Sequence, residues 1–137
     1  MGAFTDDLET KLLDYTLKTA NSTNYAQPSS LYVGLCTTAP SDSASGEYTI
    51  GTNNYARKQI AFANASSGTA TAPTATCTFN QATGGAWGTV YGYAIFNAST
   101  GTNASNYLFY GSLASNITVN QNDTVEFASS SISLSYD

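Results

Sequence analysis

The chain has 137 residues, with nine acidic and four basic side chains and no histidine. This length suits one domain that buries roughly two thirds of the surface of its unfolded chain. The lack of histidine excludes Ser-His-Asp and Cys-His catalysis and histidine-ligated metals, and a net charge of −5 without a basic stripe argues against a nucleic-acid partner.

The first predicted element is an amphipathic helix over residues 5–18. Thr5 or Asp6 can cap its start, and Asp6 and Glu9 have the spacing of a capping box. The run from residue 21 to residue 24, Asn-Ser-Thr-Asn, ends it. Its apolar stripe consists of Leu8, Leu12, Leu13, Tyr15 and Leu17. We expect this stripe either to close one end of the domain core or to dock on another subunit.

From residue 31 onward, short apolar or alternating segments are separated by turn residues. The expected strands cover residues 31–36, 55–62, 75–79, 90–96, 107–113, 117–119, 124–127 and 132–136. About eight short strands without βαβ alternation predict an all-β fold, a sandwich or a barrel. The predicted organisation is therefore a helix and linker over residues 1–24 and a β-sandwich domain over residues 25–137.

The long loop over residues 37–54 is a candidate interface, because loops of this length in compact domains are usually functional or mobile. The predicted interface residues in and beside it are Asp42, Glu47, Tyr48, Tyr55, Arg57 and Lys58. Arg57 and Lys58 hold half of the chain's positive charge, which favours a partner contact over a solvated strand end.

Two pairs of acidic residues invite a catalytic or calcium-binding interpretation, Asp42 with Glu47 and Asp123 with Glu126. The simpler interpretation is that the aspartates form turns and the glutamates are solvated, because neither pair has the context that perturbs an acid. We therefore expect no catalytic residue, no metal site, no cofactor and no enzymatic activity.

The segment from Trp87 to residue 96 is the strongest strand signal in the chain. Its alternation places Tyr91, Tyr93 and Ile95 on one face and Val90, Ala94 and Phe96 on the other. Apolar groups on both faces predict a central strand. Tyr48, Tyr55, Trp87, Tyr91 and Tyr93 could stack on sugar rings, but packing is the favoured interpretation because aromatic side chains bury the most area.

The two cysteines, Cys36 and Cys77, each lie in a predicted strand. A disulfide between adjacent strands is one interpretation, and two buried free thiols are the favoured one. The acidic first fifteen residues predict no secretory signal, so the chain is expected to fold in a cytoplasm. No apolar run approaches the roughly 20 residues of a membrane helix.

Several segments share their order with one group of known proteins. They are the amphipathic N-terminal helix, Leu31-Tyr32-Val33-Gly34-Leu35, Asn54-Tyr55-Ala56-Arg57, Trp87-Gly88-Thr89-Val90, Leu108 to Leu113, and Asp123-Thr124 with Leu134. In this arrangement the chain resembles small virion proteins of tailed bacteriophages, over most of its length. It departs from their pattern at Asn122, where glycine commonly precedes the aspartate.

The resemblance implies a non-enzymatic structural virion protein, because members are tail or tail-fibre proteins or head decoration (cement) proteins with a jelly-roll-like sandwich. The first interpretation is a cement protein that bridges major capsid protein subunits as a homodimer or homotrimer. The alternative is a tail, baseplate or tail-fibre component that contacts a host-surface glycan. Both imply a virion protein assembled in the host cytoplasm, without a nucleic-acid or membrane partner. The sequence leaves head and tail open, because one fold serves both.

Overall fold

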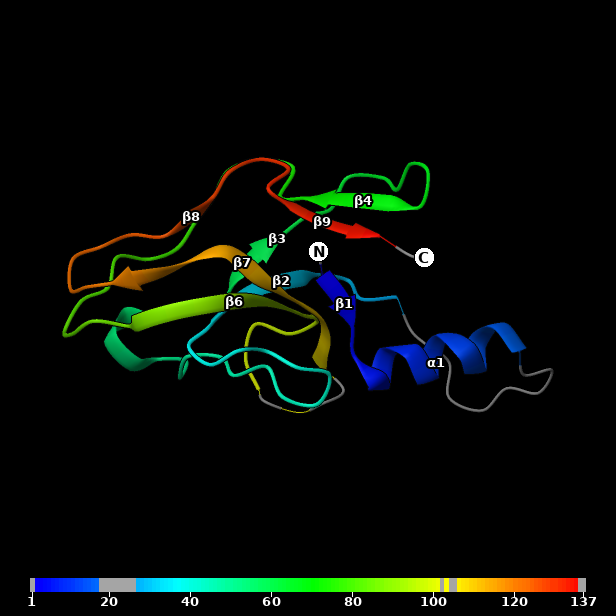
Figure 1. Ribbon diagram of the computed structural model, residues 1–137, viewed down its shortest axis with the longest axis horizontal. Coiled ribbons are helices and arrows are strands. Elements are labelled where there is room, and N and C mark those ends of the chain that lie inside the picture. The colour runs from blue at the N-terminus through cyan, green and yellow to red at the C-terminus, as the bar shows by residue number, and fades with distance from the viewer. Residues whose placement is uncertain (1, 18–26, 102, 104–105, 136–137) are drawn as a thin grey trace.

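The computed structural model describes residues 2–17, 27–101, 103 and 106–135 (Figure 1). Seven of the described strands form one sheet in the order β3-β2-β6-β7-β1-β9-β4. Their bounds are β1 (Gly2–Phe4), β2 (Leu31–Cys36), β3 (Lys58–Ile60), β4 (Thr69–Ala72), β6 (Gly88–Phe96), β7 (Tyr107–Val119) and β9 (Ile132–Ser135). A second sheet pairs β5 (Cys77–Thr78) with β8 (Glu126–Phe127), and the helices are α1 (Asp6–Leu17) and η1 (Thr52–Asn54).

Strand β6 lies between β2 and β7 and pairs antiparallel with both, which confirms the predicted central strand. The register against β7 shifts between Val90 and Gly92. This irregularity interrupts the side-chain alternation. Val90 therefore packs in the main core with Tyr93 and Ile95, on the face opposite to the predicted one.

The main core joins the two sheets. Val33 and Ile95 of the large sheet are fully buried in it, and Phe79 and Phe127 enter from the small sheet and its flanking segment. The rings of Phe79 and Phe127 lie 6.2 Å apart, and Tyr93 meets Phe127 edge-on at 5.9 Å. The predicted all-β fold with one helix is confirmed, and two sheets over a shared core form a sandwich-like arrangement. A jelly-roll order is not confirmed, because seven of the nine described strands lie in one sheet.

A second apolar cluster lies on the opposite face of β2 and β6, and the loop over residues 37–54 covers it. Its members are Cys36, Ala94, Phe96 and Tyr107, with Tyr110 packed against them. The Tyr107 hydroxyl donates to the Ser41 carbonyl at 2.8 Å, and Pro40 packs on Gly92, where a Cβ atom would approach Pro40 Cδ to 2.9 Å. The length of this loop thus has a structural cause, because it encloses a second core.

Helix α1 begins at a cap that also fastens it to the sheet. Thr5 Oγ1 accepts the Leu8 N–H at 3.4 Å and donates to the Tyr107 carbonyl at 2.9 Å. Of the two predicted caps, the structure therefore selects Thr5. Strand β1, immediately before it, pairs with β7 and β9, so residues 2–4 belong to the large sheet. From there α1 projects away from the sheets (Figure 1).

Other elements differ from their predicted extents. The strand expected over residues 55–62 is reduced to β3, the two expected over 107–119 are the single strand β7, and β1 and β4 were not predicted at all. Lys18, the helix end at 21–24, the boundary between residues 24 and 25, and residue 136 lie outside the described residues. Across the described ranges, none of the helices has the length and apolar character needed to cross a membrane.

Both cysteines are free and buried, which confirms the interpretation of two reduced thiols. Burial raises the pKa of each thiol above its ordinary value. The neighbouring Glu47 carboxylate raises the pKa of Cys36 further. Because the thiolate is the reactive form, both side chains behave as small apolar groups at neutral pH.

Candidate functional site

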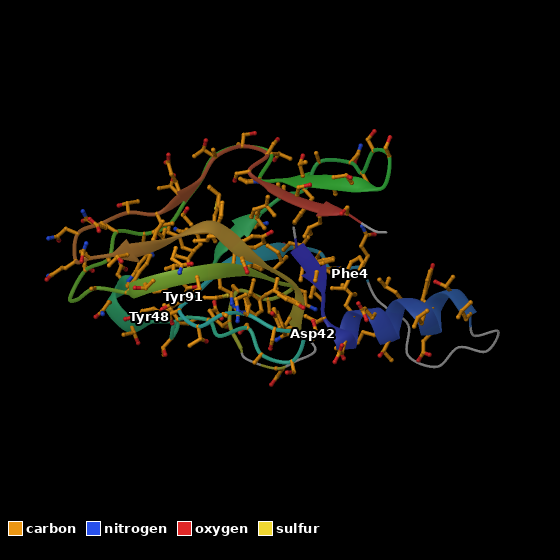
Figure 2. The ribbon with its side chains drawn as sticks, viewed as in Figure 1. Phe4, Asp42, Tyr48 and Tyr91 are labelled. Carbon is orange, nitrogen blue, oxygen red and sulfur yellow. The ribbon has the colours of Figure 1, made fainter. Side chains whose placement is uncertain are left out.

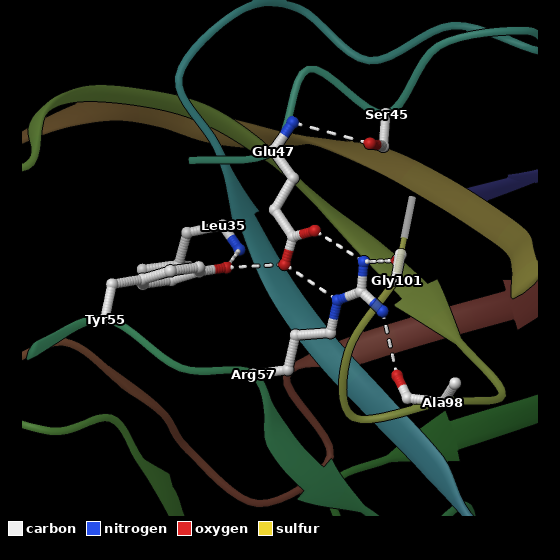
Figure 3. A network of polar contacts seen from close by, with 7 residues as sticks. All are labelled: Leu35, Ser45, Glu47, Tyr55, Arg57, Ala98 and Gly101. Atoms are coloured by element: carbon white, nitrogen blue, oxygen red, sulfur yellow. Dashed lines mark hydrogen bonds and ion pairs between the residues drawn. The ribbon is translucent and has the colours of Figure 1, made fainter. Parts of the chain in front are cut away.

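A buried ion pair joins Glu47 to Arg57 (Figure 3). Arg57 Nη2 donates to Glu47 Oε2 at 2.6 Å, and Arg57 Nε donates to Glu47 Oε1 at 2.8 Å. The side chains of Arg57 and Glu47 expose only 0% and 6% of their surface. This is the bidentate geometry in which arginine binds a carboxylate most strongly.

The remaining donors of Arg57 fasten the turn that follows β6. Nη1 donates to the Ala98 carbonyl and Nη2 to the Gly101 carbonyl, both at 2.8 Å (Figure 3). The guanidinium carbon lies 3.3 Å from the ring centre of Phe96, a cation–π contact. One arginine thus ties together the long loop, the turn after β6 and the second core.

Tyr55 completes the network on its other side. Its hydroxyl donates to Glu47 Oε1 at 3.0 Å and accepts the Leu35 N–H at 2.7 Å. Burial and the Glu47 charge raise the pKa of Tyr55 above its ordinary value. Gly34 leaves the space that the carboxylate occupies, since a Cβ atom there would lie 2.5 Å from Glu47 Oε1.

Three of the predicted interface residues therefore belong to an internal network. Tyr55 and Arg57 expose 1% and 5% of their surface, so their side chains offer a partner almost no area. Glu47 was expected to be solvated, and this was wrong, because the carboxylate is buried against Arg57. The sequence did not reveal this pairing, since it depends on the loop folding back over the sheet.

The other three predicted interface residues lie nearer the surface. Asp42 is exposed and accepts a hydrogen bond from the Tyr110 hydroxyl, which raises the pKa of Tyr110 to about 12. Lys58 is half-buried, and its Nζ donates to Asn80 Oδ1 at 2.7 Å. Tyr48 is also half-buried. A contact of these three residues with a partner stays a prediction.

The structure assembles a surface group that sequence analysis missed, where η1, the segment before β6 and the turn between β7 and β8 meet. We call it the amide cluster, and its members are Asn53, Asn54, Asn80, Gln81 and Asn122. Asn54 Nδ2 donates to the Gln81 carbonyl at 3.0 Å, Asn80 Nδ2 to the Asn54 carbonyl at 3.1 Å, and Gln81 Nε2 to the Asn122 carbonyl at 2.9 Å. These bonds hold the three chain segments in fixed relative positions.

The amide cluster continues into an aromatic side chain. Asn53 Nδ2 donates to the Tyr48 hydroxyl and to the Ala86 carbonyl, each at 3.0 Å. Below it, Nε1 of the buried Trp87 donates to the Asn53 carbonyl at 2.9 Å. Tyr48 packs edge-on against Tyr55 with ring centres 5.4 Å apart, which fixes its ring at the edge of the cluster.

Local backbone chemistry explains why asparagine occupies these turns. Asn53, Asn54 and Asn122 have φ angles of 49°, 66° and 73°, in the left-handed region that asparagine tolerates better than most residues. The Asn-Asn pair and the Asn-Asp pair each signal a turn in the sequence. Nothing in the sequence signals that the two turns meet, because their contact depends on the arrangement of the sheets.

The amide cluster offers hydrogen bonds, and the charged Lys58 reaches its edge by donating to Asn80 Oδ1. Each amide side chain provides two N–H donors and an acceptor oxygen, and none of the five carries a charge. Asn54, Gln81 and Asn122 are exposed. Among the described residues, none donates to the side-chain oxygen of Asn54 or of Gln81, so both oxygens remain available as acceptors. Such a surface suits a ligand rich in hydroxyl groups.

Of the five aromatic residues considered for sugar stacking, three are buried and two are partly exposed. Tyr55, Trp87 and Tyr93 are buried in the main core, which confirms packing for these three. Tyr91 is 40% exposed and Tyr48 is half-buried, so only these two have ring surface for a partner (Figure 2).

The acidic residues form no candidate metal site in the part of the chain that the structure describes. Glu47 is bonded to Arg57, and Glu126 is exposed on β8. Asp123 accepts the Asn120 N–H through Oδ2 at 2.8 Å, the turn role predicted for it. The expectation that the chain is not an enzyme stays a prediction.

The fold is β-rich, and neutral amide side chains gather at one set of its turns. The family model of the podophage GP4 fiber I protein gp80 matches residues 3–135, and the chain belongs to this family. It is therefore a structural component of a tailed-phage virion, which confirms the resemblance that its sequence shows. None of the curated proteins compared with the chain matches it.

Proposed function

We propose that the chain is a fibre component of a phage tail that contacts a glycan on the host surface. The observation that carries this proposal is the match of residues 3–135 to a fibre-protein family. That match supports the tail alternative better than the head decoration interpretation, since the family is described as a fibre protein.

The amide cluster and Tyr48 supply the contact chemistry in this proposal. Neutral amides can donate to and accept from sugar hydroxyls, and an aromatic ring can cover an apolar sugar face. The hydrogen bonds between the three segments keep these groups in place before binding, which lowers the ordering cost of the contact. Several copies on one particle would raise weak single contacts to a strong overall attachment.

The test is binding of the purified chain to surface polysaccharide isolated from the host strain. Asn54→Gly removes one amide and keeps the backbone conformation, because glycine accepts the φ of 66° without strain. We expect affinity to fall about fivefold, the value of one neutral hydrogen bond. Calorimetry or biolayer interferometry with the polysaccharide measures it.

The matched control is Gln59→Ala, which removes an exposed amide from β3. This variant should bind as the wild type does. Unchanged affinity in Asn54→Gly, or no wild-type binding to the polysaccharide, would contradict the proposed contact. Thermal unfolding of each variant separates lost binding from lost folding.

A further inference from the structure

Helix α1 leaves a set of large apolar side chains in solvent. Leu13, Tyr15 and Leu17 expose 56%, 69% and 72% of their surface. They are three of the five large apolar side chains that are exposed among the described residues, and all three lie in the second half of one short helix. Leu8 is the one buried residue of α1.

An apolar groove of about 660 Å³ lies beside this helix. Leu12 and Tyr15 line it from α1, and Phe4, Leu31, Phe109 and Leu134 line it from strands of the large sheet. No charged side chain is among its lining residues. Figure 2 shows Phe4 at the end of β1, just before the chain enters α1.

The exposed side chains lie on more than one side of α1. Leu12 and Tyr15 are three residues apart and share the groove side, whereas Leu13 and Leu17 are four apart and lie roughly 100° or more around the helix from Leu12. A helix that is apolar on several sides is normally enclosed by protein. The described part of this chain encloses α1 only near Leu8.

We propose that α1 and the groove form the contact with a second copy of this chain, related by a two-fold axis. The groove accepts an uncharged apolar segment, and residues 12–17 of α1 offer one, with Asp14 as their only charge. Leu12 and Tyr15 belong to the helix and also line the groove, so a two-fold axis can cover both helices and both grooves at once.

The charge distribution of α1 determines the direction of this contact. Asp6, Asp7 and Glu9 lie in the first turn. A parallel arrangement would bring these acids from two copies together, in a chain whose net charge is already −5. An antiparallel arrangement centred near Tyr15 places the acidic turns at opposite ends of the contact and brings the apolar halves together.

The test is the oligomeric state of the full chain by sedimentation velocity and light scattering over a concentration series. We expect a dimer, and Leu13→Glu with Leu17→Glu should raise its dissociation constant more than about tenfold, because like charges would face each other across an apolar contact. Tyr91→Glu with Ile117→Glu is the matched control, since it places the same charges on two apolar residues exposed elsewhere, and it should leave the dimer intact.

Leu13→Ser with Leu17→Ser repeats the test with a milder change, and thermal unfolding reports whether each variant is folded. A monomeric wild type, a trimer, or a dimer that both α1 variants leave intact would overturn the proposal. A monomer whose α1 binds another virion protein would equally overturn it. This contact does not depend on glycan binding, because it involves the opposite end of the molecule (Figure 2).

Discussion

At the scale of single residues, Arg57 is the side chain whose replacement should cost most. It is buried, and among the described residues Glu47 is the one that balances its charge. We expect Arg57→Met to lower the free energy of unfolding by about 3–5 kcal/mol, because the Glu47 carboxylate would remain buried without a counter-charge. In Arg57→Met with Glu47→Gln, the loss should be well below the sum of the two single losses. Urea unfolding followed by Trp87 fluorescence measures all three.

The control for this double-mutant cycle is the ion pair of α1, whose side chains are 27% and 37% exposed. Lys11 Nζ lies 2.6 Å from Asp7 Oδ2, the same separation as the closest contact of the buried pair. Lys11→Met should change stability by less than about 0.5 kcal/mol, because solvent screens exposed charges. Similar losses of unfolding free energy in Arg57→Met and Lys11→Met would contradict the expectation that burial makes the Arg57–Glu47 pair the costlier one to break. Charge reversal at Arg57 cannot be used to test an interface, because the new carboxylate would lie next to the buried Glu47 carboxylate inside the protein.

At the scale of elements, the cap of α1 can be tested apart from its apolar face. Thr5→Ala removes the hydroxyl, whose oxygen accepts the Leu8 N–H and whose O–H donates to the Tyr107 carbonyl. We expect a loss of about 1–2 kcal/mol in the free energy of unfolding. Thr16→Ala is the control, because Thr16 is exposed and its hydroxyl donates to the Leu12 carbonyl within the helix. It should be neutral or slightly stabilising, since alanine is the better helix former. Equal losses in the two variants would argue against the cap.

How well the sequence predicts a strand depends on whether the strand's own residues specify it. β2 was predicted with its observed bounds and β6 nearly so, because long runs of apolar and β-branched residues specify strands locally. β1 and β4 are the short segments Gly-Ala-Phe and Thr-Ala-Thr-Ala, and they become strands only through their partners β7 and β9. The amide cluster and the Glu47–Arg57 ion pair could not be predicted for the same reason, since each joins segments that only the fold brings together.

At the scale of the whole molecule, the two proposed contact surfaces lie far apart. Tyr48, at the edge of the amide cluster, lies toward the end of the molecule opposite α1 (Figure 2). One end would then serve association between copies, while the other remains free for the host surface.

The location and copy number of the chain in the virion test this division. We expect antibody labelling at the tail, a small copy number set by tail symmetry, and poor adsorption of particles that lack the chain. Their heads should retain DNA on heating as wild-type heads do, because no shell-stabilising ligand has been removed. Particles that carry Asn54→Gly should contain the chain in full amount and still adsorb more weakly, since this exposed amide lies in the proposed host contact. Labelling over the head, a copy number that follows the shell, and heat-induced loss of DNA with normal adsorption would instead establish the cement interpretation.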